Sequence, residues 1–240
     1  GRPNLAHGDA LHVGAFLPGV DGIQLMMPHE ELQDRTNSVS FLDAATGECL
    51  SGYDTNTGDV GRGVCANIDP NPGFEYWASG YPVYSAVDGS VAYSAQGGMP
   101  TNFTVYWDGD LLNENLNGTS VTKPVIGEKD GQAAITGNTT LLSMTGTTAG
   151  NGSKSVPGLT ADVLGDWREE IIMRTSDNTA IRIYSTTTPT DYMIYTLMHD
   201  SAYRMQCAGQ MGAYNQPNHL SFYLGEDIRD QILNMGLVKP

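Results

Sequence analysis

The chain has 240 residues, and its 12 Lys and Arg against 27 Asp and Glu give a formal net charge of −15. This acidity, without any basic cluster, argues against nucleic acid as a ligand, and no apolar run approaches the roughly 18 residues of a membrane-spanning helix. The 29 glycines and 40% hydrophobic residues indicate a globular chain rich in turns, long enough for one all-β domain or two small ones.

Short runs of β-branched and aromatic residues alternate with turn residues along the chain and predict β-strands. In chain order these runs are 39–42, 83–85, 91–93, 103–107, 170–174, 180–184 and 192–197. A helix is predicted only at 228–237. The pattern therefore predicts an all-β fold.

Three segments, 17–23, 68–75 and 163–169, each join a glycine-containing acidic turn to an apolar strand. Their glycines, 22, 73 and 165, are separated by 51 and 92 residues. The larger spacing is about twice the ~40–50 residues of one propeller blade. We therefore expect a β-propeller architecture with four to five blades in this chain.

The three cysteines, Cys49, Cys65 and Cys207, cannot all pair within the chain, and none lies in a Cys-x-x-Cys spacing. We expect them to be buried free thiols. The first residues show no basic segment followed by an apolar one, so the printed sequence carries no visible secretion signal.

One stretch places a single lysine beside many oxygen ligands. Asn151, Gly152 and Ser153 form a polar turn before Lys154, and the acidic segment 162–170 follows. A lysine and a nearby divalent metal together neutralise the carboxylate of an acidic sugar, which a chain of this charge otherwise repels. Taken alone, the turn is also compatible with a flexible loop or an N-glycosylation acceptor.

A second constellation consists of His7, Asp9 and Glu30. Carboxylates from two turns can share a calcium ion, and an imidazole beside them can complete the ligand set or act as a base. The alternative is that Asp9 caps a turn and His7 is an ordinary loop histidine, and the spacing alone favours this alternative.

The recurrent acidic turns hold further candidate ligands of a hard cation. A solvated turn explains any one of them, but it explains their recurrence less well, so we expect structural calcium there. The spacing is not that of an EF-hand. The candidates are Asp69, Asp162, Asp166 and Glu169.

Two other side chains have a binding and a structural interpretation. Arg62, between Gly61 and Gly63, is placed for bidentate contact with a substrate carboxylate, or for a surface ion pair with Asp59. Tyr214, in an Asn-Gln-Pro turn, is either free to stack on a sugar or part of the core.

The runs Asn-Gly-Ser-Lys at 151–154, Leu-Gly-Asp-Trp-Arg-Glu-Glu at 164–170, Tyr-Trp-Asp-Gly-Asp-Leu at 106–111 and Ala-Tyr-Asn-Gln-Pro at 213–217 resemble signature runs of one family, the rhamnogalacturonan lyases of polysaccharide lyase family eleven. The resemblance extends from 7 to 225. It implies an eight-bladed β-propeller of which residues 1–240 form the carboxyl-terminal portion of the catalytic domain, without the amino-terminal blades. The missing half or a second copy of the chain is then an expected partner.

The resemblance also implies a function. The family cleaves rhamnogalacturonan I, a pectic polysaccharide, by calcium-assisted β-elimination, and is secreted and extracellular. It implies that His7, Asp9 and Glu30 are calcium ligands, that Arg62 and Lys154 face the substrate, and that either Lys154 or His7 is the base. Contacts to the sugar are implied for Asn151, Gly152, Ser153 and Tyr214.

Two other functions stay open. One is a non-catalytic carbohydrate-binding or scaffold fragment in which calcium serves stability. The other is a glycoside hydrolase whose acid pair is Asp108 with Asp110, or Glu169 with Glu170.

Overall fold

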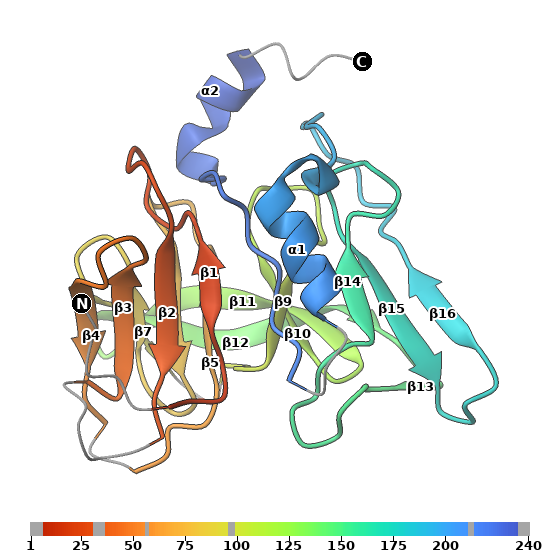
Figure 1. Ribbon diagram of the computed structural model, residues 1–240, viewed down its shortest axis with the longest axis horizontal. Coiled ribbons are helices and arrows are strands. Elements are labelled where there is room, and N and C mark those ends of the chain that lie inside the picture. The colour runs from red at the N-terminus through yellow and green to blue at the C-terminus, as the bar shows by residue number, and fades with distance from the viewer. Residues whose placement is uncertain (1–6, 31–36, 56–57, 96–98, 211–213, 235–240) are drawn as a thin grey trace.

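The computed structural model describes residues 7–30, 37–55, 58–95, 99–210 and 214–234 (Figure 1). These residues are organised mainly as antiparallel β-strands in three sheets, with four short helices. The all-β prediction is confirmed. Among the described residues, no helix has the length and apolar character needed to cross a membrane.

The first sheet is an antiparallel meander in chain order. Alternation of buried and half-buried residues along its second strand shows one face packed on the core. An irregularity between Phe41 and Leu42 shifts the register of its last pairing. Its strands are β1 (His12–Gly14), β2 (Gln24–Pro28), β3 (Val39–Asp43) and β4 (Cys49–Tyr53).

The second sheet has eight strands, because two meanders join edge to edge in the order β5-β6-β7-β8-β12-β11-β10-β9. The join is a short parallel pairing of Ala134 and Ile135 with Ser94 and Ala95. The strands are β5 (Gly63–Ala66), β6 (Glu75–Ala78), β7 (Val83–Ser85), β8 (Val91–Ala95), β9 (Phe103–Val105), β10 (Glu114–Asn117), β11 (Ser120–Lys129) and β12 (Gln132–Ser143).

This continuous sheet differs from the separate blades expected from the repeat. The cause is the length of the β11–β12 hairpin, whose outer part extends beyond β10 and reaches the edge of β8. Figure 1 shows this hairpin running from behind the β1–β4 sheet to β9 and β10 near the centre of the view. Packing of the sheets as propeller blades stays a prediction.

The third sheet is centred on β15 (Glu170–Thr175), which pairs on one side with β13 (Thr147–Thr148) and β14 (Leu159–Ala161) and on the other with β16 (Ile181–Tyr184). The helices follow it in the chain. They are η1 (Leu197–His199), α1 (Ser201–Gly209), η2 (Glu226–Ile228) and α2 (Arg229–Asn234). In Figure 1, α1 lies beside β14.

Two predictions for the helical part need correction. The expected strand at 192–197 is not a strand: this segment is irregular until η1 begins at Leu197. Helix α1 was not predicted, although Asp200 is a typical cap whose side chain accepts a hydrogen bond from the Ala202 N–H. The helix predicted at 228–237 is present as η2 and α2 as far as Asn234, and its remainder lies outside the described residues.

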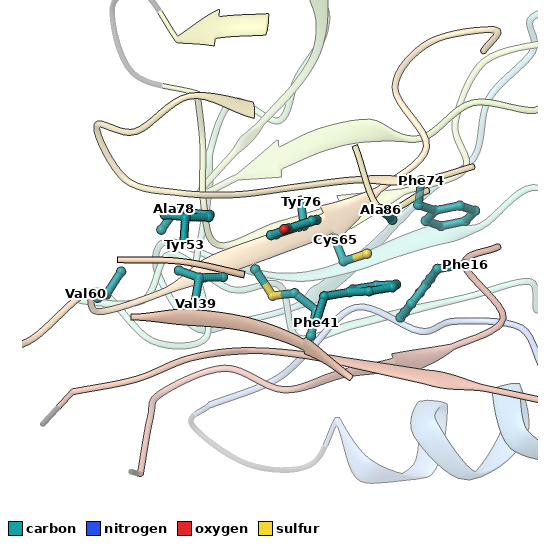
Figure 2. Packing of buried hydrophobic residues seen from close by; sticks show 11 residues of the cluster. Phe16, Val39, Phe41, Tyr53, Val60, Cys65, Phe74, Tyr76, Ala78 and Ala86 are labelled. Carbon is teal, nitrogen blue, oxygen red and sulfur yellow. The ribbon is translucent and has the colours of Figure 1, made fainter. Parts of the chain in front are cut away.

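Aromatic side chains fill the space between the first sheet and β5–β7 (Figure 2). Phe41 and Tyr76 stack across this layer with ring centroids 5.6 Å apart, and Tyr53 stacks on Tyr84 at 4.1 Å. Such pairs each contribute about 0.5–1.5 kcal/mol beyond area burial. Cys65 lies in the same layer as a buried free thiol. The contact attaches the first sheet to the second.

The predicted burial is confirmed for one of the other two cysteines and wrong for the second. Cys207 is buried on α1, but Cys49 is exposed because it begins β4, an edge strand whose first residues face solvent.

The three repeat glycines all adopt positive φ, at 101° for Gly22, 92° for Gly73 and 81° for Gly165, a conformation that favours glycine. In each turn a side chain at the start of the next strand accepts a hydrogen bond from the backbone N–H seven or eight residues earlier. A further turn, before β10 and thus the third of four in chain order, follows the same rule and was not predicted from the sequence. The pairs are Phe16 N to Gln24, Ile68 N to Glu75, Trp107 N to Glu114 and Val163 N to Glu170.

Candidate functional site

His7, Asp9 and Glu30 meet because β1 and β2 are antiparallel neighbours, with the first two residues before β1 and Glu30 after β2. The Glu30 N–H donates to the His7 carbonyl at 2.8 Å, and His7 Nδ1 lies 3.2 Å from Glu30 Oε2. Gly8 between them is packed so closely that a Cβ would lie 1.8 Å from the Pro28 oxygen. The backbone approach therefore depends on a glycine.

Lys154 enters the same site from the loop between β13 and β14. Its ammonium forms an ion pair with Asp9, and both side chains are about one-fifth exposed. The ammonium also lies 4.9 Å from the centre of the Tyr214 ring, which is exposed. Cation–π attraction and the ion pair together hold the ammonium at one position.

The polar turn before Lys154 is built by Asn151. Its Oδ1 accepts from the Ser153 N–H at 3.0 Å, the Ser153 hydroxyl at 2.9 Å and the Lys154 N–H at 3.2 Å. A bridge between Asn151 and Val156 closes the loop, and nothing lies within 4 Å of a Cβ built on Gly152. Asn151 and Ser153 thus shape the loop, and Gly152 leaves space at its tip.

The carboxyl groups of Asp9 and Glu30 influence each other. Burial raises the pKa of Glu30, and the neighbouring Asp9 raises it further. Burial also acts to raise the pKa of Asp9, but hydrogen bonds with Lys154 and Glu30 outweigh it and leave that pKa below its ordinary value. Two acids in contact with each other, of which only Asp9 pairs with an ammonium, form a site that favours additional positive charge.

Arg62 lies beneath this site and is buried. Its guanidinium donates to the carbonyls of Asn102 at 2.9 Å, Asn215 at 3.0 Å and Asp9 at 3.3 Å, and its Nε has no hydrogen-bond partner. Asp59 accepts from the Gly61 N–H instead of serving as the surface ion-pair partner. The arginine therefore joins three segments and contributes positive potential beneath Asp9.

The four carboxylates of the acidic turns are engaged by donors of the chain. Asp69 accepts from the Asn71 N–H and the Tyr93 hydroxyl, and Asp166 pairs with Arg168 at 2.8 Å. Asp162 accepts from the N–H groups of Gly165, Trp167 and Leu197.

Glu169 is directed away from the turn. Its oxygens accept from the Tyr106 N–H at 3.0 Å, the Tyr203 hydroxyl at 2.7 Å and the Asn218 amide at 3.1 Å. Burial raises its pKa to about 7. The structure therefore does not direct Asp162, Asp166 and Glu169 at one common position.

Gln216 is a site residue that sequence reasoning missed. Its side chain contacts the Asp9 carbonyl at 3.4 Å, the Leu11 N–H at 3.4 Å and Arg62 at 3.5 Å. A cavity of about 220 Å³ opens beside it next to Tyr214. The cavity is lined by Leu11, Val13, Gln206, Gly209, Tyr214, Gln216 and Pro217. The Asn-Gln-Pro run after Tyr214 was the available signal for it.

An ammonium, an exposed tyrosine ring, an imidazole and two acids that favour a cation thus share one surface. Lysine pairs with a carboxylate, and an exposed aromatic ring presents a flat apolar surface. The arrangement is suited to binding an anionic sugar.

Comparison with known proteins gives a consistent result. Residues 2–233 match the family described as Rhamnogalacturonan lyase family 11, C-terminal domain. The chain is 46% identical to rhamnogalacturonan endolyase YesW of Bacillus subtilis over 230 residues, which are 95% of the chain and 35% of YesW. It is 40% identical to rhamnogalacturonan exolyase YesX of the same species over 238 residues, covering 94% of the chain and 38% of YesX.

Solved structures agree with these relatives. The crystal structure of YesW superposes with a TM-score of 0.81, covering 92% of the chain and 36% of YesW. A Bacillus licheniformis rhamnogalacturonan lyase is 41% identical and superposes with a TM-score of 0.80, covering 92% of the chain and 36% of the B. licheniformis protein. The chain thus spans just over a third of the length of the curated relatives it matches.

Proposed function

Because this chain belongs to the rhamnogalacturonan lyase family 11 C-terminal domain family, we propose that it is part of the catalytic module of a polysaccharide lyase that cleaves rhamnogalacturonan I. One observation carries the proposal. Lys154 is held between Asp9 and Tyr214 by segments that are far apart in the sequence. An ammonium fixed in this way, beside two acids that favour a further cation, is what a galacturonate residue requires.

The reaction we propose is β-elimination. A base removes the proton at C5 of galacturonate, the C4–O4 bond breaks, the leaving sugar oxygen is protonated, and a C4=C5 double bond forms. Negative charge develops on the uronate carboxylate as the C5 proton leaves, so fixed positive charge nearby lowers the barrier. Lys154 supplies this charge directly, and Arg62 adds to it from beneath without leaving its carbonyl partners.

Calcium is the cofactor we propose, and its fit can be judged from the donor set. Asp9 and Glu30 are in contact, the pKa of Glu30 is raised by burial and by this neighbour, and His7 adds an imidazole. The ligand atoms of His7, Asp9 and Glu30 do not all lie within 4.8 Å of one another, but neighbouring carboxylates are the ligand type that a hard cation prefers. When bound, calcium would neutralise the uronate carboxylate and so acidify the C5 proton.

The four acidic-turn residues fit calcium less well, because their oxygens already accept from N–H, hydroxyl or guanidinium donors. A calcium ion would have to displace these bonds. We therefore assign the cofactor to His7, Asp9 and Glu30, and a metal role for Asp69, Asp162, Asp166 and Glu169 stays a prediction.

Two residues are candidates for the base. Lys154 is placed beside the proposed sugar site, but an ammonium must lose its proton before it can accept another. His7 is more exposed, yet as a metal ligand it would not be available. Tyr214 and the Asn151–Ser153 turn are proposed to hold the sugar in position.

The larger assembly is also a proposal. The successive antiparallel sheets and their likeness to the lyase structures support blades of an eight-bladed propeller that is completed by the rest of the family's catalytic domain or by a second copy. Secretion to the extracellular space, where pectin is found, is part of this proposal.

The glycoside hydrolase alternative is less compatible with the geometry. Asp108 and Asp110 are both paired with Lys123, and Glu169 and Glu170 are buried and bonded to different backbone segments. Neither pair has two carboxyl groups facing an open sugar site, which this chemistry requires.

The test is incubation of the chain with rhamnogalacturonan I, with calcium and then with chelator, while the ultraviolet absorbance of the new double bond is followed. We expect a calcium-dependent increase that Lys154→Ala reduces by at least about 100-fold, whereas Lys129→Ala, at an exposed position, leaves it unchanged. New reducing ends without this absorbance indicate a hydrolase. Lys154-dependent binding of the polysaccharide without any product indicates a non-catalytic binding fragment.

A further inference from the structure

The turn between β9 and β10 carries three carboxyl groups that face a common position. Asp108 and Asp110 lie in the turn and Glu114 begins β10. One oxygen from each lies within 4.8 Å of the others, a spacing that no other three acidic, histidine or cysteine side chains share in the part of the chain that the structure describes. Converging oxygens of this kind are suited to a cation.

A lysine occupies that position. Lys123 Nζ lies 2.6 Å from Asp108 Oδ2, 2.5 Å from Asp110 Oδ2 and 3.1 Å from Glu114 Oε1. The antiparallel register of Asn115 with Thr122 places Lys123 opposite Glu114. The ammonium therefore reaches the triad as a consequence of the β10–β11 pairing.

Glu114 indicates that a cation belongs there. The residue is fully buried, its Oε2 accepts from the Trp107 N–H at 2.9 Å and the Asp108 N–H at 3.2 Å, and its Oε1 faces the Lys123 ammonium at 3.1 Å. Burial raises the pKa of Glu114 to about 8 in spite of Lys123. At neutral pH the negative charge is then carried mainly by the two aspartates, and one ammonium balances a large part of it.

Equivalent turns also carry their own neutralising groups. The side chain at the position of Glu114 is the uncharged Gln24 in the first turn. The hydroxyl of Tyr93 donates to Asp69 in the second, and Arg168 pairs with Asp166 in the fourth. Intramolecular donors therefore stabilise this repeat in more than one place.

We propose that Lys123 is the resident cation of the 108–114 turn: its ammonium takes the position of a divalent ion and makes the folding of this turn independent of metal. The residue thus differs in role from Lys154, which pairs with a single carboxylate at an open surface. The proposal does not depend on lyase activity.

The first test measures thermal unfolding of the 240-residue chain in chelator and in calcium. Lys123→Met leaves the triad without a cation, so we expect the melting temperature in chelator to fall by on the order of 10 °C. Calcium should restore part of this loss, and this shift should exceed the one that calcium causes in the wild type. Lys129→Met is the matched control on the same strand, and its melting behaviour should follow that of the wild type.

The second test locates the ion with terbium, whose emission is sensitised by the adjacent Trp107. We expect Lys123→Met to show emission that a further Asp110→Asn change abolishes, and we expect the wild type to show no emission that depends on Asp110. Lys123→Arg, which keeps a cation, should resemble the wild type and covers the case in which Lys123→Met does not fold. Emission that depends on Asp110 in the wild type or in Lys123→Arg would show that a metal belongs in the turn and would overturn the proposal. A Lys123→Met chain that keeps wild-type stability in chelator would overturn it as well.

Discussion

Replacement of Arg62 by methionine should destabilise the whole chain, because it removes a cross-link between three distant segments. Three carbonyls, those of Asn102, Asn215 and Asp9, lose a guanidinium donor. A hydrogen bond to a charged group contributes about 1.5–3 kcal/mol. Counting the two shorter bonds in full and the 3.3 Å bond as minor gives a loss of about 3–6 kcal/mol.

Desolvation of the guanidinium offsets part of this amount, since burial lowers the pKa of Arg62 and thus disfavours its charged form. We therefore expect the lower half of the range, about 3–4.5 kcal/mol, which corresponds to a fall in melting temperature of about 6–18 °C for a chain of this size. The expected loss of free energy of unfolding is a large part of the usual ~5–15 kcal/mol stability of a domain.

The assay is urea unfolding followed by both circular dichroism and tryptophan fluorescence, with agreement of the two probes required before a free energy is extracted. Arg182→Met is the matched control, because this exposed arginine donates to one carbonyl, that of Thr145 at 2.7 Å. Its free energy of unfolding should change by less than about 1 kcal/mol. If Arg62→Met is as stable as Arg182→Met, the three-way cross-link has no energetic importance and the reasoning is refuted.

Other predictions concern the site and the pH dependence of folding. Gly8→Ala should lower stability and impair calcium binding, because the new Cβ would clash with the Pro28 oxygen at 1.8 Å. Gly152→Ala is the control and should keep wild-type stability, because nothing lies within 4 Å of its Cβ. Equal melting curves for the two variants would contradict this prediction. Burial raises the pKa of Glu114 to about 8 from an ordinary 4.5. The contribution of protonated Glu114 to the free energy of unfolding is thus complete below about pH 4.5 and is lost as the pH rises through about 8. The free energy of unfolding falls over this interval by at most about 1.4 kcal/mol per pH unit. Glu114→Gln should flatten the measured dependence between these pH values, and the exposed Glu128→Gln should not; a dependence unchanged in Glu114→Gln would show that another group causes it.

Local patterns were sufficient for the all-β class and for several strands. The run at 39–42 falls within β3, 83–85 is β7, and 180–184 contains β16. The repeat glycines were correctly interpreted as turns, since all three adopt positive φ. The expected strand at 192–197 failed because Tyr192 and Leu197 at its two ends pack on the core without strand pairing, in the cluster around Trp167 and α1.

The candidate site could be predicted from the sequence as a set of residues, but not as a geometry. The Asn151–Lys154 run and the His7–Asp9 pair are local signals. Their contact across 145 residues, through the Lys154–Asp9 ion pair, depends on how the β13–β14 loop packs beside β1. The three carbonyl partners of Arg62 carry no local signal, because any residue has a carbonyl.

By itself the sequence determined the all-β class, several strands, the acidic turns and the polar and charged residues available for chemistry, because each depends on neighbours within a few positions. Only the tertiary structure decided how those charges are used. Strand pairing places Lys123 opposite Glu114, and packing of the β13–β14 loop places Lys154 beside Asp9, so that one lysine is enclosed by three acids and the other remains at an open surface beside Tyr214. A lysine's function depends on which distant carboxylates surround it and how much water reaches it, and both are set by packing.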